Sequence, residues 1–127
     1  MTTSLNAGYK IALRNQIKGD VFDDPLVLGM YATDASVYQI TPVAVVCPRD
    51  EQDVIACMAI ANTFGVPILA RGGGTSLAGQ TVGSAVVIDF SRYMNHVLEV
   101  DFDQQWAQTF HGAGNGNAAQ VFVDMRK

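Results

Sequence analysis

Apolar residues recur at four-residue spacing near the start of the chain, and this spacing predicts a helix over residues 5–18. The apolar stripe consists of Leu5, Tyr9, Leu13 and Ile17. Gly19 and Asp20 end the pattern. A second, short helix is expected after Asp24, because an aspartate followed by Pro25 is a common helix start.

Three short apolar runs follow, each bounded by residues that turn or break the chain. They are Val43–Val46, Pro67–Ala70 and Ala85–Phe90. Continuous apolar runs of this length are typical of strands that are covered on both faces, as in parallel sheets. The runs therefore predict a small parallel sheet.

The residues between the first two runs predict a helix over 51–64. Asp50 suits the N-cap, and Asp53 lies in the first turn, where the helix dipole favours acidic side chains. Gly65 suits the position just beyond the last turn. A right-handed crossover places this helix over one face of the sheet. The order strand, helix, strand, loop, strand indicates an α/β or α+β core.

The last part of the chain has a different pattern. Residues 97–100 and 106–110 predict an antiparallel pair of strands around a turn at residues 101–104. Residues 112–117 read as a loop, and residues 118–126 as a short helix or a frayed tail.

Composition narrows the class of protein. The 127 residues correspond to one domain, and 49% apolar with 16% charged residues excludes a disordered chain. A net charge of −4 argues against nucleic acid as a partner. Cys47 and Cys57 are too few for a metal framework and are expected to pack in the interior. Neither a signal peptide nor a transmembrane segment is predicted, so we expect a cytoplasmic protein.

The segment after the second apolar run carries the candidate chemistry. Gly72, Gly73 and Gly74 offer successive backbone N–H groups with no side chains to keep a ligand away. Thr75 and Ser76 add hydroxyl donors, and Arg71 adds a positive charge. Together these groups suit a diphosphate, while the alternative is a flexible glycine-rich turn beside a surface arginine.

Two other phosphate-binding motifs fail at single positions. Residues 74–81 have the spacing of a nucleoside triphosphate-binding loop, but Gln80 stands where that loop needs a lysine. The dinucleotide fingerprint fails because Leu77 stands where its last glycine is required.

The glycine loop and the strand after it resemble a known family. The run Arg71–Gln80 followed by Ala85–Asp89 is similar to the FAD-binding domain of the vanillyl-alcohol oxidase and p-cresol methylhydroxylase (PCMH-type) class. Its nearest branch is that of D-lactate dehydrogenase and glycolate oxidase. Further segments that resemble this branch are Tyr31–Ser36, Pro42, Val45–Asp53 and Asp89–Asn95. The likeness covers about residues 20–107.

The resemblance implies an α+β fold with a small parallel sheet and flanking helices. It divides the chain into an N-terminal helical segment (1–40), the first lobe of the FAD-binding domain (41–110) and a divergent tail (111–127). It implies that the glycine loop holds the pyrophosphate of FAD. The candidate cofactor-binding residues are Pro42, Arg71, Gly72, Gly73, Gly74, Thr75, Ser76, Leu77 and Gln80. Residues 71–80 contain no histidine, so the resemblance implies non-covalent FAD.

The resemblance also implies a function for the whole protein. We expect the FAD-binding portion of an oxidoreductase that acts on 2-hydroxy acids such as D-lactate or glycolate. The second FAD-binding lobe and the substrate domain of such proteins find no match here, which indicates a truncated fragment. The alternative is a non-catalytic remnant, or a module that works only with a separate partner chain. Self-association is plausible, and neither a catalytic residue nor a metal site is assigned.

Overall fold

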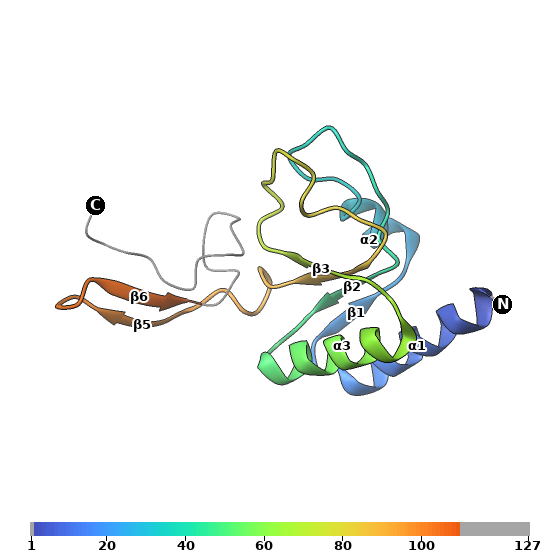
Figure 1. Cartoon of the computed structure of the whole chain (residues 1–127), viewed down its shortest axis with the longest axis horizontal. Coiled ribbons are helices and arrows are strands. Elements are labelled where there is room, and N and C mark those ends of the chain that lie inside the picture. The colour runs from blue at the N-terminus through green and yellow to red at the C-terminus, as the bar shows by residue number, and fades with distance from the viewer. Residues whose placement is uncertain (1, 110–127) are drawn as a thin grey trace.

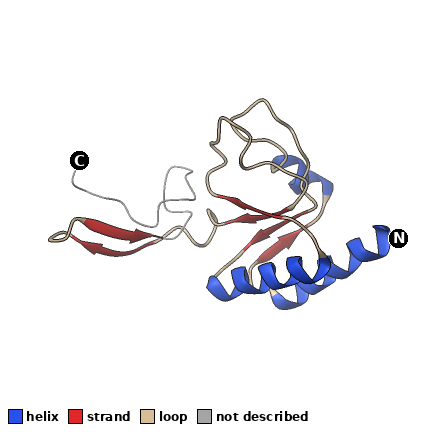
Figure 2. Cartoon of the chain, viewed as in Figure 1, coloured by secondary structure: helices blue, strands red, loops and turns tan. Residues whose placement is uncertain are grey.

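The computed structural model describes residues 2–109, in which a four-stranded sheet lies against helices α1 and α3 (Figures 1 and 2). The helices are α1 (Thr2–Gln16), α2 (Pro25–Met30) and α3 (Glu51–Phe64). The strands are β1 (Asp20–Phe22), β2 (Ala44–Cys47), β3 (Ile68–Arg71), β4 (Val86–Asp89), β5 (Val97–Asp101) and β6 (Trp106–Thr109).

The sheet has the strand order β1-β2-β4-β3. Both β2 and β3 run parallel to β4, which confirms the predicted arrangement of the three apolar runs. The fourth strand, β1, was not predicted, and it pairs antiparallel with β2. It is three residues long and begins with an aspartate, so it lacks the apolar run by which the other strands were recognised. The sheet is therefore mixed rather than purely parallel.

The ends of α3 agree with the predicted caps. The Asp50 carboxylate accepts a hydrogen bond from the Asp53 N–H at 3.0 Å. Gly65 adopts a left-handed conformation (φ 64°), and its N–H donates to carbonyls of the last turn. At the start of α2, Asp24 accepts from the Val27 N–H at 3.0 Å. Short-range capping chemistry thus sets the bounds of both helices.

The larger core lies between the sheet and the pair α1 and α3. Its buried residues include Tyr9 and Leu13 from α1, Cys57 and Ile60 from α3, and Val46, Val86 and Ile88 from the sheet. The opposite face has a smaller cluster of Val45, Cys47 and Val87, against which Leu28 and Tyr31 pack. Both cysteines are buried as expected, and burial raises the pKa of each thiol to about 11.

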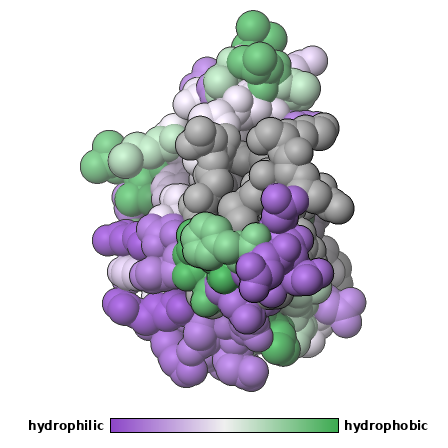
Figure 3. All heavy atoms as spheres, turned by 90° about the vertical axis from the view of Figure 1, so that its left-hand side faces the viewer, coloured by the Kyte–Doolittle hydropathy of each residue, from purple (hydrophilic) through white to green (hydrophobic). Residues whose placement is uncertain are grey.

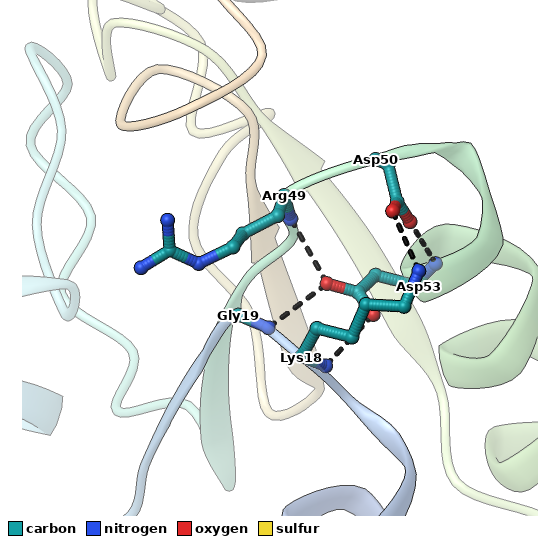
Figure 4. Close-up of polar contacts among 5 residues, drawn as sticks. All are labelled: Lys18, Gly19, Arg49, Asp50 and Asp53. Atoms are coloured by element: carbon teal, nitrogen blue, oxygen red, sulfur yellow. Dashed lines mark hydrogen bonds and ion pairs between the residues drawn. The ribbon is translucent and has the colours of Figure 1, made fainter.

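A single buried carboxylate joins the first helix, the first strand and α3 (Figure 4). Asp53, only 1% exposed, accepts hydrogen bonds from the backbone N–H groups of Lys18 (2.8 Å), Gly19 (2.9 Å) and Arg49 (3.0 Å). A Cβ at Gly19 would lie 2.0 Å from the Cys47 carbonyl oxygen, so only glycine fits this crossing. Asp53 therefore does more than complement the helix dipole, because it fixes the chain on either side of the β1–β2 pair.

Strands β5 and β6 form an antiparallel hairpin that projects from the sheet (Figure 1), as predicted. The Asp101 carboxylate accepts from the Gln104 N–H at 2.8 Å in the connecting turn. Large apolar side chains of this hairpin are exposed: Val97, Leu98, Val100 and Phe102. The predicted loop over 112–117 and the helix or tail over 118–126 lie outside the described residues.

The described part of the chain offers neither a membrane-spanning helix nor a metal site. No helix within residues 2–109 is long and apolar enough to cross a membrane. The same residues contain no group of three histidine, cysteine or acidic side chains placed to hold a metal ion.

Candidate functional site

Two loops meet above the carboxyl end of β3 (Figure 1). One is the glycine loop, residues 72–85, which joins β3 to β4. The other, residues 31–43, joins α2 to β2 and is called the facing segment below. The carboxyl ends of neighbouring parallel strands are where open sheets with crossover helices bind ligands. The topology thus brings Arg71 and the first residues of the glycine loop to a favourable edge.

Arg71 joins the two loops from inside. Its guanidinium donates from Nη1 to the carbonyl oxygens of Tyr31 (3.4 Å) and Thr81 (3.3 Å), and from Nη2 to that of Thr33 (2.9 Å). The guanidinium also lies over the Tyr31 ring, 5.1 Å from its centroid. The positive charge predicted from the sequence is therefore present beside the loop, but its donors are directed at backbone carbonyls. Arg71 therefore helps to fix the conformation of the glycine loop, in addition to placing a positive charge beside it.

Two glycines turn the loop where other residues would not fit. Gly74 has φ +67°, and a Cβ there would lie 2.5 Å from Nη2 of Arg71. Gly79 has φ +73°, and a Cβ there would lie 2.5 Å from Cδ2 of Tyr38 in the facing segment. Both positions combine a left-handed backbone with a close approach. The loop is therefore folded tightly around the Arg71 side chain and against Tyr38.

A carboxylate and two hydroxyls complete the connection. Asp34 accepts from the Thr81 hydroxyl at 2.9 Å and from the Ser36 N–H at 2.8 Å. Hydrogen bonds from Ser36, followed by those from Thr81, lower the pKa of Asp34 to about 2. Within the glycine loop, Ser76 Oγ accepts from the N–H groups of Ala78 and Gln80, both at 3.2 Å. These bonds order the loop from within.

Backbone donors remain available on this ordered loop. Among the described residues, no acceptor receives a hydrogen bond from the N–H groups of Gly73, Gly74, Ser76 or Leu77. Gly73 is exposed, and the Leu77 side chain is 83% exposed. Backbone donors need water or a ligand when the protein supplies no acceptor. Successive donors of this kind beside a guanidinium suit an anion.

Exposed apolar side chains lie on both loops. Val37, Tyr38 and Ile40 of the facing segment and Leu77 of the glycine loop are all exposed. In Figure 3, strongly apolar residues stand at the top of the molecule, where the two loops of Figure 1 lie, above a predominantly hydrophilic lower half. A ligand that combines a charged group with flat apolar rings suits such a surface.

The predicted site residues separate into three groups. Gly72, Gly73, Gly74, Thr75, Ser76, Leu77 and Gln80 all lie in the glycine loop. Arg71 lies beneath it, half-buried. Pro42 is buried at the base of β2, where the next residue, Val43, donates its N–H to Ala85 at 2.9 Å. Pro42 therefore lies at the amino end of β2, at the sheet edge opposite the carboxyl end of β3, and is not part of the exposed loop.

Apart from Pro42, sequence reasoning assigned no role to the residues of the facing segment. Tyr31, Thr33, Asp34 and Tyr38 of this segment all contact the glycine loop or Arg71. For Tyr31, Thr33 and Asp34 the one signal was the run Tyr31–Ser36, which resembled the same branch of the family, and Tyr38 lies outside that run. Nothing in the composition of that run indicated which atoms would meet Arg71.

Comparison with known proteins assigns this chain to a family. The family described as FAD binding domain matches residues 42–124. This chain belongs to that family. The match includes the glycine loop, β2, β4 and part of the facing segment, and it continues through residues 111–124.

Curated relatives agree with this family. A D-2-hydroxyglutarate dehydrogenase from Pseudomonas putida is 36% identical over 108 residues, which are 80% of this chain and 10% of that protein. A glycolate oxidase subunit from Bacillus subtilis is 37% identical over 75 residues, 57% of this chain and 16% of the relative. A mitochondrial D-lactate dehydrogenase (cytochrome) from Kluyveromyces lactis is 34% identical over 64 residues, 47% of this chain and 11% of the relative. The chain thus spans a small part of the relatives it matches.

Solved structures show the same fold. A 4-ethylphenol oxidase from Gulosibacter chungangensis has a TM-score of 0.73 and 24% identity, over 83% of this chain and 22% of that one. A p-cresol methylhydroxylase has a TM-score of 0.69 and 17% identity, over 89% of this chain and 24% of that one. The predicted α+β fold of the PCMH-type class is therefore confirmed for this chain.

Proposed function

We propose that this chain holds the diphosphate of FAD in its glycine loop, as part of an oxidoreductase that acts on 2-hydroxy acids. The observation that supports this most is a set of backbone N–H groups beside the Arg71 guanidinium, those of Gly73, Gly74, Ser76 and Leu77, for which the described residues supply no acceptor. The substrate class rests on the printed names of the relatives, which are dehydrogenases or oxidases of 2-hydroxyglutarate, lactate and glycolate. The predicted cytoplasmic location is part of the same proposal.

The residues present fit this cofactor. The glycine loop would hold the diphosphate through backbone donors, and the exposed apolar side chains of the two loops would cover part of the ring systems. When bound, FAD supplies the hydride acceptor. The chain's own contribution is to orient the cofactor and to exclude water from one side of it. Residues 71–80 contain no histidine, which supports non-covalent attachment to this loop.

Replacing Gly73 by valine tests the backbone donors directly. Gly73 is exposed, so we expect Gly73→Val to leave the fold intact. The valine side chain should keep a ligand away from the neighbouring N–H groups. Wild-type chain is expected to bind FAD weakly, with a dissociation constant no lower than tens of micromolar, or a binding free energy of about −6 kcal/mol at most. Gly73→Val is expected to bind at least about tenfold more weakly, because charge-assisted hydrogen bonds to an anion are lost. Calorimetric titration measures both values, and equal affinities would contradict the proposed role of the loop.

The exposed hairpin supports a second part of the proposal, that the chain associates with further protein. Two-stranded sheets are marginal in water unless another layer covers them. Here Leu98, Val100 and Phe102 expose apolar surface on β5 and at its turn. We therefore expect the chain to self-associate when no other partner is present, and Phe102→Glu to weaken this association. Sedimentation velocity of both proteins at increasing concentration checks this expectation, and a wild-type chain that stays monomeric throughout would contradict it.

A further inference from the structure

We propose that Tyr31 and Asp89 are positioning residues of the glycine loop, which they hold through Arg71. This inference rests on the proposed function insofar as the loop is the FAD site. It concerns two residues that lie outside the loop. The chain of contacts runs from the end of β4, through the Tyr31 side chain, to the Arg71 guanidinium and then to Gly74.

The first link is a buried carboxylate with a fixed orientation. Asp89 is the last residue of β4, lies opposite Arg71 in the sheet register and is 5% exposed. Its Oδ1 accepts from the N–H of Ser91 (2.8 Å) and from the Ser91 hydroxyl (2.6 Å). Its Oδ2 accepts from the Tyr31 hydroxyl at 2.5 Å. With Oδ1 held in this way, Oδ2 offers the tyrosine a single well-defined partner.

The second link is the tyrosine itself. Tyr31 follows α2, and its N–H donates to carbonyls of that short helix. Its hydroxyl bond to Asp89 ties this position to the sheet. Burial and the neighbouring carboxylate raise the pKa of Tyr31, so the hydroxyl remains a donor at neutral pH. The facing segment therefore begins at a point fixed to β4.

The third link is the Arg71 guanidinium, which contacts both Tyr31 and the glycine loop. The Tyr31 ring and carbonyl oxygen both contact the Arg71 guanidinium, which also donates to the carbonyl of Thr33. Gly74 turns so closely around this guanidinium that a Cβ would meet Nη2 at 2.5 Å. Because the loop is wrapped around Arg71, a shift of Tyr31 moves the surface on which the loop rests. Tyr31 thus sets the position of N–H donors that it does not touch.

Tyr93 offers a closely matched control. Its hydroxyl donates to the Asp20 carboxylate at 2.6 Å, and the Arg49 guanidinium lies 4.3 Å from its ring centroid. It therefore repeats the tyrosine, carboxylate and arginine arrangement of Tyr31, but no contact in the described residues connects it to the glycine loop. Tyr31→Phe and Tyr93→Phe each remove one hydroxyl from such an arrangement.

The test uses the full chain and two measurements. In the absence of ligand, we expect amide hydrogen exchange of residues 72–81 to accelerate in Tyr31→Phe and not in Tyr93→Phe. With FAD, we expect Tyr31→Phe to bind about tenfold more weakly than wild type, the effect of one hydrogen bond to a charged group. In an Arg71→Ala background, Tyr31→Phe is expected to have no further effect on affinity, because the link is already broken. Equal loop exchange in the two tyrosine variants would overturn the inference.

The two proposals fail in different ways. If wild-type chain does not bind FAD, the proposed function fails, while the exchange of residues 72–81 still decides the role of Tyr31. If FAD binds and Tyr31→Phe matches Tyr93→Phe in both affinity and exchange, the proposed function stands and the positioning role is wrong.

Discussion

Gly74→Ala is expected to destabilise the glycine loop and to weaken FAD binding by at least about tenfold. An alanine at φ +67° costs about 1–2 kcal/mol in backbone strain alone. Its Cβ would also lie 2.5 Å from Nη2 of Arg71. The guanidinium can move, but only by giving up its bonds to the carbonyls of Tyr31, Thr33 and Thr81. Chemical unfolding and FAD titration of the variant measure the two effects.

Gly83→Ala provides the control for this change. Gly83 lies in the same connection between β3 and β4, and a Cβ there would meet Cδ2 of Leu69 at an ordinary 3.5 Å. This variant is expected to keep wild-type stability and affinity. If Gly74→Ala behaved like Gly83→Ala, the arrangement of the loop around Arg71 would be wrong.

Asp53→Ala is expected to have the largest effect on stability, a loss of about 3 kcal/mol or more in the free energy of unfolding. The change leaves three backbone N–H groups, those of Lys18, Gly19 and Arg49, without their buried acceptor. Each unsatisfied donor of this kind costs about 1–3 kcal/mol when it is shielded from water. For a domain of this size the melting temperature should fall by about 10 °C. Differential scanning calorimetry measures the shift.

Two variants at the same helix terminus sharpen this test. Asp50→Ala removes an exposed cap that accepts from one backbone N–H, that of Asp53, and from the exposed Lys18 ammonium, so its effect should be clearly smaller. Asp53→Asn keeps the volume of the side chain but directs an amide NH₂ at one of the N–H donors, so it should resemble Asp53→Ala. A stability loss at Asp50 that equals the loss at Asp53 would show that Asp53 acts only as a residue of the first helical turn.

The parts of the fold that were predicted correctly depend on short-range patterns. Helix α3 begins and ends at the predicted residues because Asp50 and Gly65 cap it through contacts within a few positions. The strands β2, β3 and β4 were recognisable because each is a continuous apolar run. Strand β1 has no such run, and it is held in place by pairing with β2, which lies more than twenty residues later. The residues within and next to β1 form no pattern that predicts this pairing.

At the site, too, features set by neighbouring residues were predictable, and features set by distant contacts were not. The glycines and hydroxyls of the loop were predictable because their chemistry is local and matches a family motif. The direction of the Arg71 side chain was not, since its acceptors are backbone carbonyls up to forty positions away. Carbonyl groups are identical at every residue, so no side-chain pattern identifies them. Asp53 was read as a favourable charge for the same reason, because its partners are backbone N–H groups of distant residues.

The most direct test of the FAD site is a titration of isotope-labelled full chain with FAD, followed by the backbone amide resonances. The account predicts saturable shifts that are largest for Gly73, Gly74, Ser76 and Leu77, with small shifts on α1 and α3. Adenosine diphosphate should shift the same amides, because it carries the same diphosphate. Shifts that avoid residues 72–81, or no shifts at millimolar FAD, would contradict the assignment of the glycine loop as the diphosphate site.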